Sequence, residues 1–301
     1  MVLRIGYLGP RGSFTEEAME VYTKGINIYE KVEFSTISGL IYAVGTKINE
    51  AVVPFENSIE GSVNVTLDIL IHESKAMIKG ELVLPINHHL LAKKAYPLEK
   101  IERVYSHPQA LYQCRRFLNE KMPGAVLRET ESTAEAAMIV SKTDRPYAAI
   151  GKKDLSTLYN LVLLSENIQD YKENFTRFII LSDNDSMPTG CDRTSLVFAT
   201  ENKPGSLYRI LGLFARENLN LTKIESRPSR RALGEYVFLL EVEGHRQDEV
   251  LKKVLGEVEK NATFFKILGS YPRWRESYPP FPGGRADASQ TCLKHEAEGF
   301  S

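Results

Sequence analysis

Short apolar runs alternate with helical patterns over residues 1–183. Strand-like runs are predicted at 3–9, 50–58, 80–92 and 125–132, and helical patterns follow such runs, for example at 14–22 and 109–120. Glycine, serine and proline residues fall between the runs, as expected of turns. About five strands beside helices in this rhythm predict an α/β region, built as one open sheet or as two small sheets with a cleft between them.

A polar, turn-rich segment at 182–192 separates this region from a second one. The order predicted over 193–272 is strand, helix, strand, strand, helix, strand, which is the βαββαβ order of ferredoxin-like domains. Residues 276–301 are rich in proline and glycine and have no period, so we expect a disordered tail.

Composition and charge narrow the class of protein. The chain has 301 residues, 43% hydrophobic and 26% charged, with a formal net charge of -1, so we expect a soluble protein that binds neither nucleic acid nor membranes. The N-terminus shows no signal-peptide pattern, and a cytoplasmic location is expected. Cys114, Cys191 and Cys292 match no metal-binding spacing, and we expect neither a metal nor a cofactor.

Four junctions share a design in which a strand ends, a short loop follows and a helix starts. They lie at 9–17, 54–64, 106–111 and 131–137. In the first and last, Ser13 with Glu16 and Ser132 with Glu135 fit the S-x-x-E capping box. Capping alone would explain any single junction, but four helix N-termini at the ends of strands also favour binding of a small anion.

The anion is predicted to be a carboxylate rather than a nucleotide phosphate. Neither G-x-x-x-x-G-K-[ST] nor G-x-G-x-x-G occurs in the chain. Neutral side chains near the junctions could add hydrogen bonds that select a carboxylate by geometry: Asn57, Ser58, Ser62, Gln109 and Gln113. The two glutamines lie four residues apart on one helix face, and a solvated helix surface remains the alternative for them.

The common catalytic constellations are absent. No H-E-x-x-H or G-x-S-x-G occurs, and the adjacent His88 and His89 point to opposite faces of a strand, so they cannot chelate a metal together. His107 either acts as a base or supports its loop. In the segment 174–178, Thr176 and Arg177 face opposite sides of a strand, and an edge strand with polar residues outward is the alternative to a site.

Seven segments in register resemble the prephenate dehydratase family with its ACT regulatory domain. They are "GPRGSFTEEA", "VPFENSIEGSV", "SHPQAL", "ESTAEAA", "NFTRF", "KPGSLYRIL" and "KIESRP", and the resemblance covers 5–272. It implies a two-lobed catalytic region like type II periplasmic binding proteins, with the active site in the cleft. It also implies decarboxylating dehydration of prephenate to phenylpyruvate in L-phenylalanine biosynthesis, with feedback by L-phenylalanine at the ACT domain.

The resemblance also implies roles for individual residues. The catalytic residues would be Thr176, Arg177, Glu56 and Asn57. The substrate-binding residues would be Ser13, Ser58, Ser62, Ser106, His107, Gln109, Gln113, Ser132, Thr133, Ala134, Asn174 and Phe178. The L-phenylalanine site would contain Gly205, Ser206, Leu207 and Tyr208, in place of the family's Gly-Ala-Leu-Val, together with Glu225, Ser226, Arg227 and Pro228.

Our mechanistic hypothesis follows from the substrate. Loss of a carboxylate and a hydroxyl makes the prephenate ring aromatic, so the enzyme needs only to assist departure. Thr176 would donate to the leaving hydroxyl, and Arg177 would hold the carboxylate that survives.

Three alternatives remain open at this stage. The first is an arogenate dehydratase, and the second is a two-lobed anion receptor fused to an amino-acid sensor. The third is a fusion with chorismate mutase, which we do not expect because the motifs begin at Gly6. The partners expected are prephenate, L-phenylalanine and further copies of the chain, in a homodimer or homotetramer formed through the catalytic and ACT domains.

Overall fold

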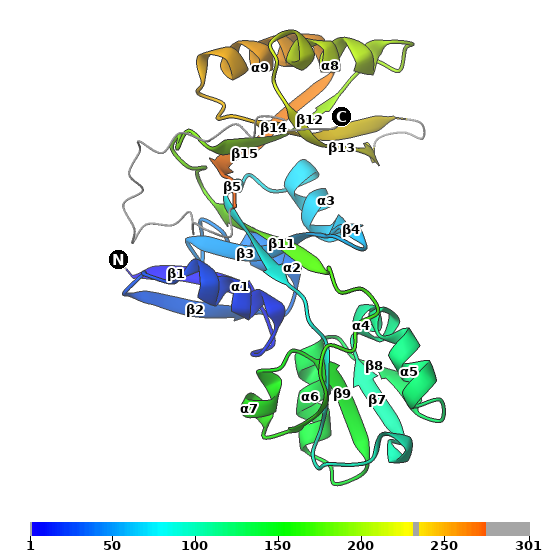
Figure 1. The fold of residues 1–301 in the computed structure, drawn as a ribbon. Coiled ribbons are helices and arrows are strands. Elements are labelled where there is room, and N and C mark those ends of the chain that lie inside the picture. The colour runs from blue at the N-terminus through cyan, green and yellow to red at the C-terminus, as the bar shows by residue number, and fades with distance from the viewer. Residues whose placement is uncertain (1, 231–234, 275–301) are drawn as a thin grey trace, which may run out of the picture.

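The computed structural model describes residues 2–230 and 235–274, and the tail expected at 276–301 lies outside the described residues. The chain is arranged in three parts along one axis: a C-terminal domain, a first lobe in the middle, and a second lobe at the far end (Figure 1). Each part contains one β-sheet, so the expectation of two small sheets in the N-terminal region is confirmed.

The first lobe has the strand order β2-β1-β3-β11-β5. Strand β1 is parallel to β2 and β3, whereas β11 returns from the second lobe and runs antiparallel to β3 and β5. Its strands are β1 (Leu3–Leu8), β2 (Tyr29–Phe34), β3 (Glu50–Asn57), β4 (Gly61–Ser62), β5 (Met77–Pro85) and β11 (Phe175–Ser182). Its helices are α1 (Phe14–Tyr22), α2 (Ile37–Tyr42) and α3 (Asn64–His72).

The second lobe has the strand order β10-β6-β9-β7-β8. Its strands are β6 (His89–Ala92), β7 (Arg103–Ser106), β8 (Val126–Glu129), β9 (Tyr147–Gly151) and β10 (Val162–Ser165). Its helices are α4 (Pro108–Gln113), α5 (Arg115–Lys121), α6 (Thr133–Ser141), α7 (Leu155–Tyr159) and a 3-10 turn (Leu98–Lys100). The chain passes between the lobes twice, after β5 and before β11 (Figure 1), which is the type II periplasmic-binding arrangement we expected.

Several local predictions for this region were incomplete or wrong. The apolar run at 80–92 is not one strand, because it is divided between β5 and β6 in different lobes. The helix predicted at 109–120 is broken at Cys114, whose φ of -113° and ψ of 13° are not helical. Strand β2 was not predicted, because its charged sequence YEKVEF has the mostly exposed pattern of an edge strand.

The C-terminal domain confirms the predicted βαββαβ order. Its elements are β12 (Asp192–Ala199), α8 (Ser206–Arg216), β13 (Leu221–Pro228), β14 (Tyr236–Glu243), α9 (Glu249–Asn261) and β15 (Phe264–Pro272), with strand order β13-β14-β12-β15. Helices α8 and α9 cover the outer face of the sheet (Figure 1), and a core containing Phe198, Phe214 and Val258 fills the space between them.

The inner face of this sheet shares a hydrophobic core with the first lobe. Val197, Leu239 and Leu268 belong to the same buried cluster as Val53 and Ile179. Burial of apolar surface contributes about 25 cal/mol per Å², so a continuous core of this kind holds the two parts in one position.

The two backbones also approach closely. At Gly269, whose φ is +154°, a Cβ atom would lie 2.2 Å from the carbonyl oxygen of Ile78 on β5. A residue with a side chain therefore cannot occupy this position without shifting one of the two strands.

Candidate active site and regulatory pocket

Thr176 lies at the start of β11, where the first lobe meets the second, and its hydroxyl is held by Asn57 on β3. The Asn57 amide donates to Thr176 Oγ1 at 3.0 Å and to Asn174 Oδ1 at 2.8 Å. The two strands are paired in register at Thr176 and Asn57. Thr176 is only partly buried, so the hydroxyl is both fixed and accessible.

The polar network continues from the first lobe into the second. Asn174 donates to Gln113 Oε1 at 2.8 Å, and His88 Nε2 lies 3.0 Å from the same oxygen. Because that oxygen is an acceptor, His88 carries its proton on Nε2. Burial lowers the pKa of His88 from 6.5 to about 4, so the ring is neutral at physiological pH.

Two further contacts join the lobes near this network. Gln113 Nε2 donates to Glu60 Oε1 at 3.3 Å, and Lys152 pairs with Glu17 at 3.2 Å. Gly12 also packs against the second lobe, because a Cβ atom built there would lie 2.6 Å from Leu155 Cδ2. The N-termini of α1 and α6 therefore face each other across the boundary between the lobes, as the 3.6 Å from that Cβ to Ala134 Cβ indicates.

Both predicted capping boxes are present. Ser13 accepts from the Glu16 N–H at 3.2 Å and Ser132 from the Glu135 N–H at 3.0 Å. The glutamates reach back one residue further than in the standard box, to the N–H groups of Gly12 and Glu131. These bonds satisfy backbone donors that would otherwise lie unpaired at the two helix starts.

The other predicted residues of the second lobe mainly support the local backbone. Ser106 donates to the Ile150 carbonyl at 2.7 Å, and His107 Nδ1 accepts from the Gln109 N–H at 3.3 Å, so His107 caps α4. Thr133 is buried at the start of α6. These residues shape the helix ends, and only Gln113 among the residues of α4 reaches the Thr176 network.

In the first lobe, some predicted site residues have partners away from Thr176. Ser58 Oγ accepts from the Phe175 N–H at 3.0 Å, and Phe178 is buried in the core beneath α1. Ser62 binds Glu225 Oε2 on β13 of the C-terminal domain at 2.5 Å. Ser62 is therefore engaged between domains in this structure.

The structure places Arg177 on the side of the sheet that faces the C-terminal domain. Its guanidinium binds Glu241 on β14 through two bonds, Nη2–Oε1 at 2.7 Å and Nη1–Oε2 at 2.9 Å. It also contacts Glu81 Oε2 at 3.2 Å and Glu56 Oε2 at 2.9 Å. The opposite orientation of Thr176 and Arg177 is as predicted, but the carboxylates that Arg177 holds belong to the chain itself.

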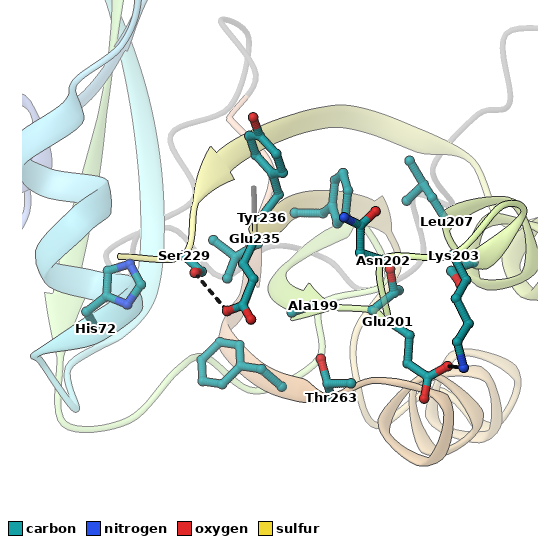
Figure 2. Close-up of a pocket in the computed structure, with 15 residues that line it drawn as sticks. His72, Ala199, Glu201, Asn202, Lys203, Leu207, Ser229, Glu235, Tyr236 and Thr263 are labelled. Carbon is teal, nitrogen blue, oxygen red and sulfur yellow. Dashed lines mark hydrogen bonds and ion pairs between the residues drawn. The ribbon is translucent and has the colours of Figure 1, made fainter. Parts of the chain in front are cut away.

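A pocket of about 380 Å³ opens in the C-terminal domain next to the first lobe. Figure 2 shows His72, the last residue of α3, on one side of it, opposite Ser229 and Glu235. The lining residues come from the loop before α8, the end of β13, β14 and the start of β15: Ala199, Thr200, Glu201, Asn202, Lys203, Ser206, Leu207, Ser229, Glu235, Tyr236, Val237, Phe238, Thr263 and Phe264.

The predicted regulatory residues divide into two groups. Ser206 and Leu207 line this pocket, next to Gly205, whose φ of +79° lies in the left-handed region. Glu225 and Arg227 instead face the first lobe, where Arg227 binds Asn64 at 2.8 Å. The remaining residues of the predicted group are not among those that line the pocket: Tyr208, Ser226 and Pro228.

Sequence reasoning missed two residues. His88 was considered only as a metal ligand, and His72 was not considered at all. The signal available for His88 was its position just after Pro85, where the chain leaves the first lobe. Nothing in the local sequence indicates that His72 reaches a pocket of another domain.

Two other features were absent from the part of the chain that the structure describes: a group of side chains for a metal ion and a helix that could cross a membrane. Within 2–230 and 235–274, no three His, Cys, Asp or Glu side chains are grouped so that they could hold a metal ion. In the same residues, no helix is long and apolar enough to cross a membrane.

The fold and the site define a two-lobed α/β protein with a ferredoxin-like C-terminal module. Residues 5–186 match the family model described as prephenate dehydratase, and 194–260 match the ACT domain model. The chain belongs to the prephenate dehydratase family.

Relatives and a solved structure agree with this assignment. The chain is 42% identical over 273 residues to a bifunctional chorismate mutase/prephenate dehydratase of Aquifex aeolicus, covering 90% of this chain and 74% of that protein. It is 41% identical over 274 residues to the prephenate dehydratase of Methanocaldococcus jannaschii, covering 88% and 97%. The crystal structure of prephenate dehydratase from Arthrobacter aurescens in complex with L-Phe superposes with a TM-score of 0.81 at 34% identity, covering 90% of both chains.

Proposed function

We propose that the protein is a prephenate dehydratase that converts prephenate to phenylpyruvate, carbon dioxide and water. The observation that carries the proposal is the hydrogen bond from the Asn57 amide to Thr176 Oγ1 at the boundary between the lobes. Because the amide already donates to this oxygen, the Thr176 proton is directed elsewhere and is available to the leaving hydroxyl of the substrate.

The proposed chemistry needs only weak acid assistance. Aromatisation of the ring drives loss of the carboxylate and the hydroxyl together, with the electrons of the breaking C–C bond entering the ring as the C–O bond breaks. The Thr176 hydroxyl gives its proton to the departing oxygen, which leaves as water, and solvent returns a proton to Thr176. Such assistance contributes typically 10²–10⁴-fold to a rate, which is suited to a side chain that is itself a poor acid.

The substrate dianion is assigned to the helix ends rather than to Arg177. The guanidinium of Arg177 contacts three carboxylates of the chain, so we propose that other groups hold most of the substrate's negative charge. The N-termini of α1 and α6 present a positive dipole end from each lobe.

Feedback inhibition by L-phenylalanine at the C-terminal domain forms the second part of the proposal. The Arthrobacter relative was crystallised with L-Phe. The pocket beside Ser206 is of a size to take a small amino acid, and its wall combines Leu207 and Phe264 with the polar Asn202 and Thr263. We further propose a homodimer or homotetramer that acts in the cytoplasm.

One experiment tests the proposal. Phenylpyruvate formation from prephenate is measured at neutral pH, with and without L-phenylalanine, using the purified chain and Thr176→Ala. Turnover that falls at least about a hundredfold in the variant and decreases with phenylalanine supports both parts. If the chain converted arogenate but not prephenate, it would be an arogenate dehydratase. If it converted neither compound, the alternative of a two-lobed receptor would stand.

A further inference from the structure

Arg177 and Glu241 form a buried ion pair between the catalytic region and the ACT domain. Arg177 is 9% exposed and Glu241 is 1% exposed, and two hydrogen bonds of 2.7 and 2.9 Å join them. Burial alone would lower the pKa of Arg177, but the negative charges around it, Glu241 first among them, together outweigh burial and raise the pKa. Burial alone would likewise raise the pKa of Glu241, but Arg177 and the neighbouring cations together lower it, so both side chains are charged.

The pair belongs to a larger cluster in which charges balance. Arg193 of β12 contacts Glu81 at 2.8 Å, and Lys223 of β13 contacts Glu56 at 2.5 Å. The cluster thus contains three cations and three carboxylates, and each domain contributes to both sets: Arg177, Glu56 and Glu81 come from the first lobe, and Arg193, Lys223 and Glu241 come from the ACT domain. Leaving any one of them unpaired in this low-dielectric environment is costly, so the groups hold one another in place.

The cluster lies directly behind the catalytic hydroxyl. Arg177 is opposite Glu56 in the register of β11 and β3, and the next pair in the same register is Thr176 opposite Asn57. The register shifts between Arg177 and Phe178, so the strands are irregular at this point. The Arg177–Glu56 contact at 2.9 Å therefore fixes the two strands beside an irregularity, one residue from the Thr176–Asn57 hydrogen bond.

The aromatic ring of Phe55 also contacts the Arg177 guanidinium. The Arg177 Cζ lies 4.8 Å from the centroid of the Phe55 ring on β3, a cation–π contact that prefers a flat guanidinium. A lysine would keep the charge but lose the two-bond contact with Glu241 and the flat stacking. The site thus requires the shape of arginine as well as its charge.

We propose that Arg177 is a positioning residue, anchored by Glu241 of the ACT domain, that holds β11 against β3 so that Thr176 is oriented for the reaction. The ACT domain thereby contributes a residue that supports catalysis, separately from the regulatory pocket. This inference rests on the proposed function for its kinetic test. It differs from a substrate-binding role for Arg177, because a group that positions Thr176 affects the chemical step rather than the binding of prephenate.

The kinetic test uses the full chain with Arg177→Lys and a matched control, Arg193→Lys. Arg193 is a partly buried arginine of the same cluster, but its strand is not the one that carries Thr176. We expect Arg177→Lys to lower kcat about tenfold or more with KM within about twofold, and Arg193→Lys to leave both within about twofold. A rise in KM with kcat unchanged, or an equal loss of kcat in Arg193→Lys, would overturn the inference.

The anchor is tested by a double-mutant cycle. Glu241→Gln, although it lies in the ACT domain, is expected to lower kcat in the same way as Arg177→Lys. The kcat of the double variant should be no more than about twofold below that of the less active single variant, because both changes break the same interaction. If the losses in kcat of the two single variants multiply in the double variant, Glu241 does not act through Arg177. If Arg177→Lys does not fold, Glu56→Gln takes its place in the cycle.

A readout that needs no turnover separates this inference from the proposed function. Amide hydrogen exchange at 174–178 is compared in the substrate-free chain and its two arginine variants. Exchange is expected to rise in Arg177→Lys and to stay unchanged in Arg193→Lys. If the unaltered chain did not act on prephenate, the proposed function would fail, and the exchange result alone would decide the positioning role of Arg177. Unchanged exchange at 174–178 in Arg177→Lys would reject that role.

Discussion

Asn57 and Thr176 are 119 residues apart in the sequence, yet the amide of one donates to the hydroxyl of the other at 3.0 Å. The contact forms because β11, after the chain has built the whole second lobe, returns to pair with β3 in the first. The Thr176–Asn57 contact therefore forms only when both passages between the lobes are complete.

Removal of this amide is expected to impair the chemical step. In Asn57→Ala, Thr176 loses its orienting donor, and kcat should fall about a hundredfold with a smaller change in KM. Steady-state kinetics on prephenate measure both constants. The matched control is Asn49→Ala, an exposed asparagine that accepts from the Arg4 N–H. An Asn57→Ala enzyme of normal kcat would show that Thr176 needs no partner.

His88 is expected to make stability depend on pH. Its pKa is 6.5 when unperturbed and about 4 in the folded chain, so the unfolded state binds the proton more tightly. The stability associated with the neutral ring is fully present above about pH 6.5, falls as pH drops towards about 4, and changes no further below it. The total loss is about 3 kcal/mol, and denaturant unfolding across this range measures it.

His88→Gln isolates this contribution from those of other groups. Glutamine keeps a donor for Gln113 Oε1 but does not titrate. The stability of the variant should therefore depend on pH less steeply than that of the unaltered chain between about pH 6.5 and 4. Parallel curves for the two proteins would mean that His88 does not titrate in this range.

The C-terminal domain was predictable because its patterns are strong and local. Strand β14 is a largely apolar run and α8 is apolar on one face, so the type and order of these elements follow from the sequence pattern. The short α2 and the charged edge strand β2 lack such a pattern, since little of their surface is buried. Their positions depend on the sheet they join rather than on their own residues.

At the site, too, the local sequence pattern does not show which distant residues meet. The sequence indicates that Arg177 faces away from Thr176, but not what it meets there, because Glu241 is 64 residues further on in another domain. Ser62, a substrate-binding residue by resemblance, reaches Glu225 across the domain boundary in this structure. Which side chains meet at that boundary depends on how the domains dock, and docking has no signature within a single segment.

The regulatory pocket is expected to be sensitive at Gly205. This glycine has φ +79° and precedes Ser206 and Leu207 in the pocket wall, so alanine strains the backbone there. In Gly205→Ala, the phenylalanine concentration for half inhibition should rise about tenfold, with kcat within about twofold. Inhibition assays on prephenate turnover measure both.

The control for backbone strain is Gly190→Ala. Gly190 has φ +82° and no heavy atom within 4 Å of a built Cβ, so alanine there causes similar strain outside the pocket. We expect this variant to lose comparable thermal stability and to keep normal inhibition. Equal loss of inhibition in both variants would point to a general weakening of the domain rather than to the pocket.

Lys266 joins the ACT domain to the end of α3, and its removal is expected to weaken that junction. From β15, its ammonium group donates to the carbonyls of Leu70 at 2.6 Å and Ser74 at 2.7 Å, which lie at the C-terminal end of the helix. Partial burial lowers the pKa of Lys266. Lys266→Met leaves these carbonyls without a donor and should destabilise the chain by about 2 kcal/mol.

The same change should also reach the regulatory pocket, because His72 at the end of α3 forms part of its wall (Figure 2). Once α3 is no longer held at this end, the position of His72 becomes less fixed, and inhibition by phenylalanine should weaken by about threefold or more. The control is Lys252→Met, which removes an exposed lysine of α9. Thermal unfolding and inhibition assays measure the two effects, and a Lys266→Met protein that is destabilised but inhibited normally would exclude α3 from the regulatory contact.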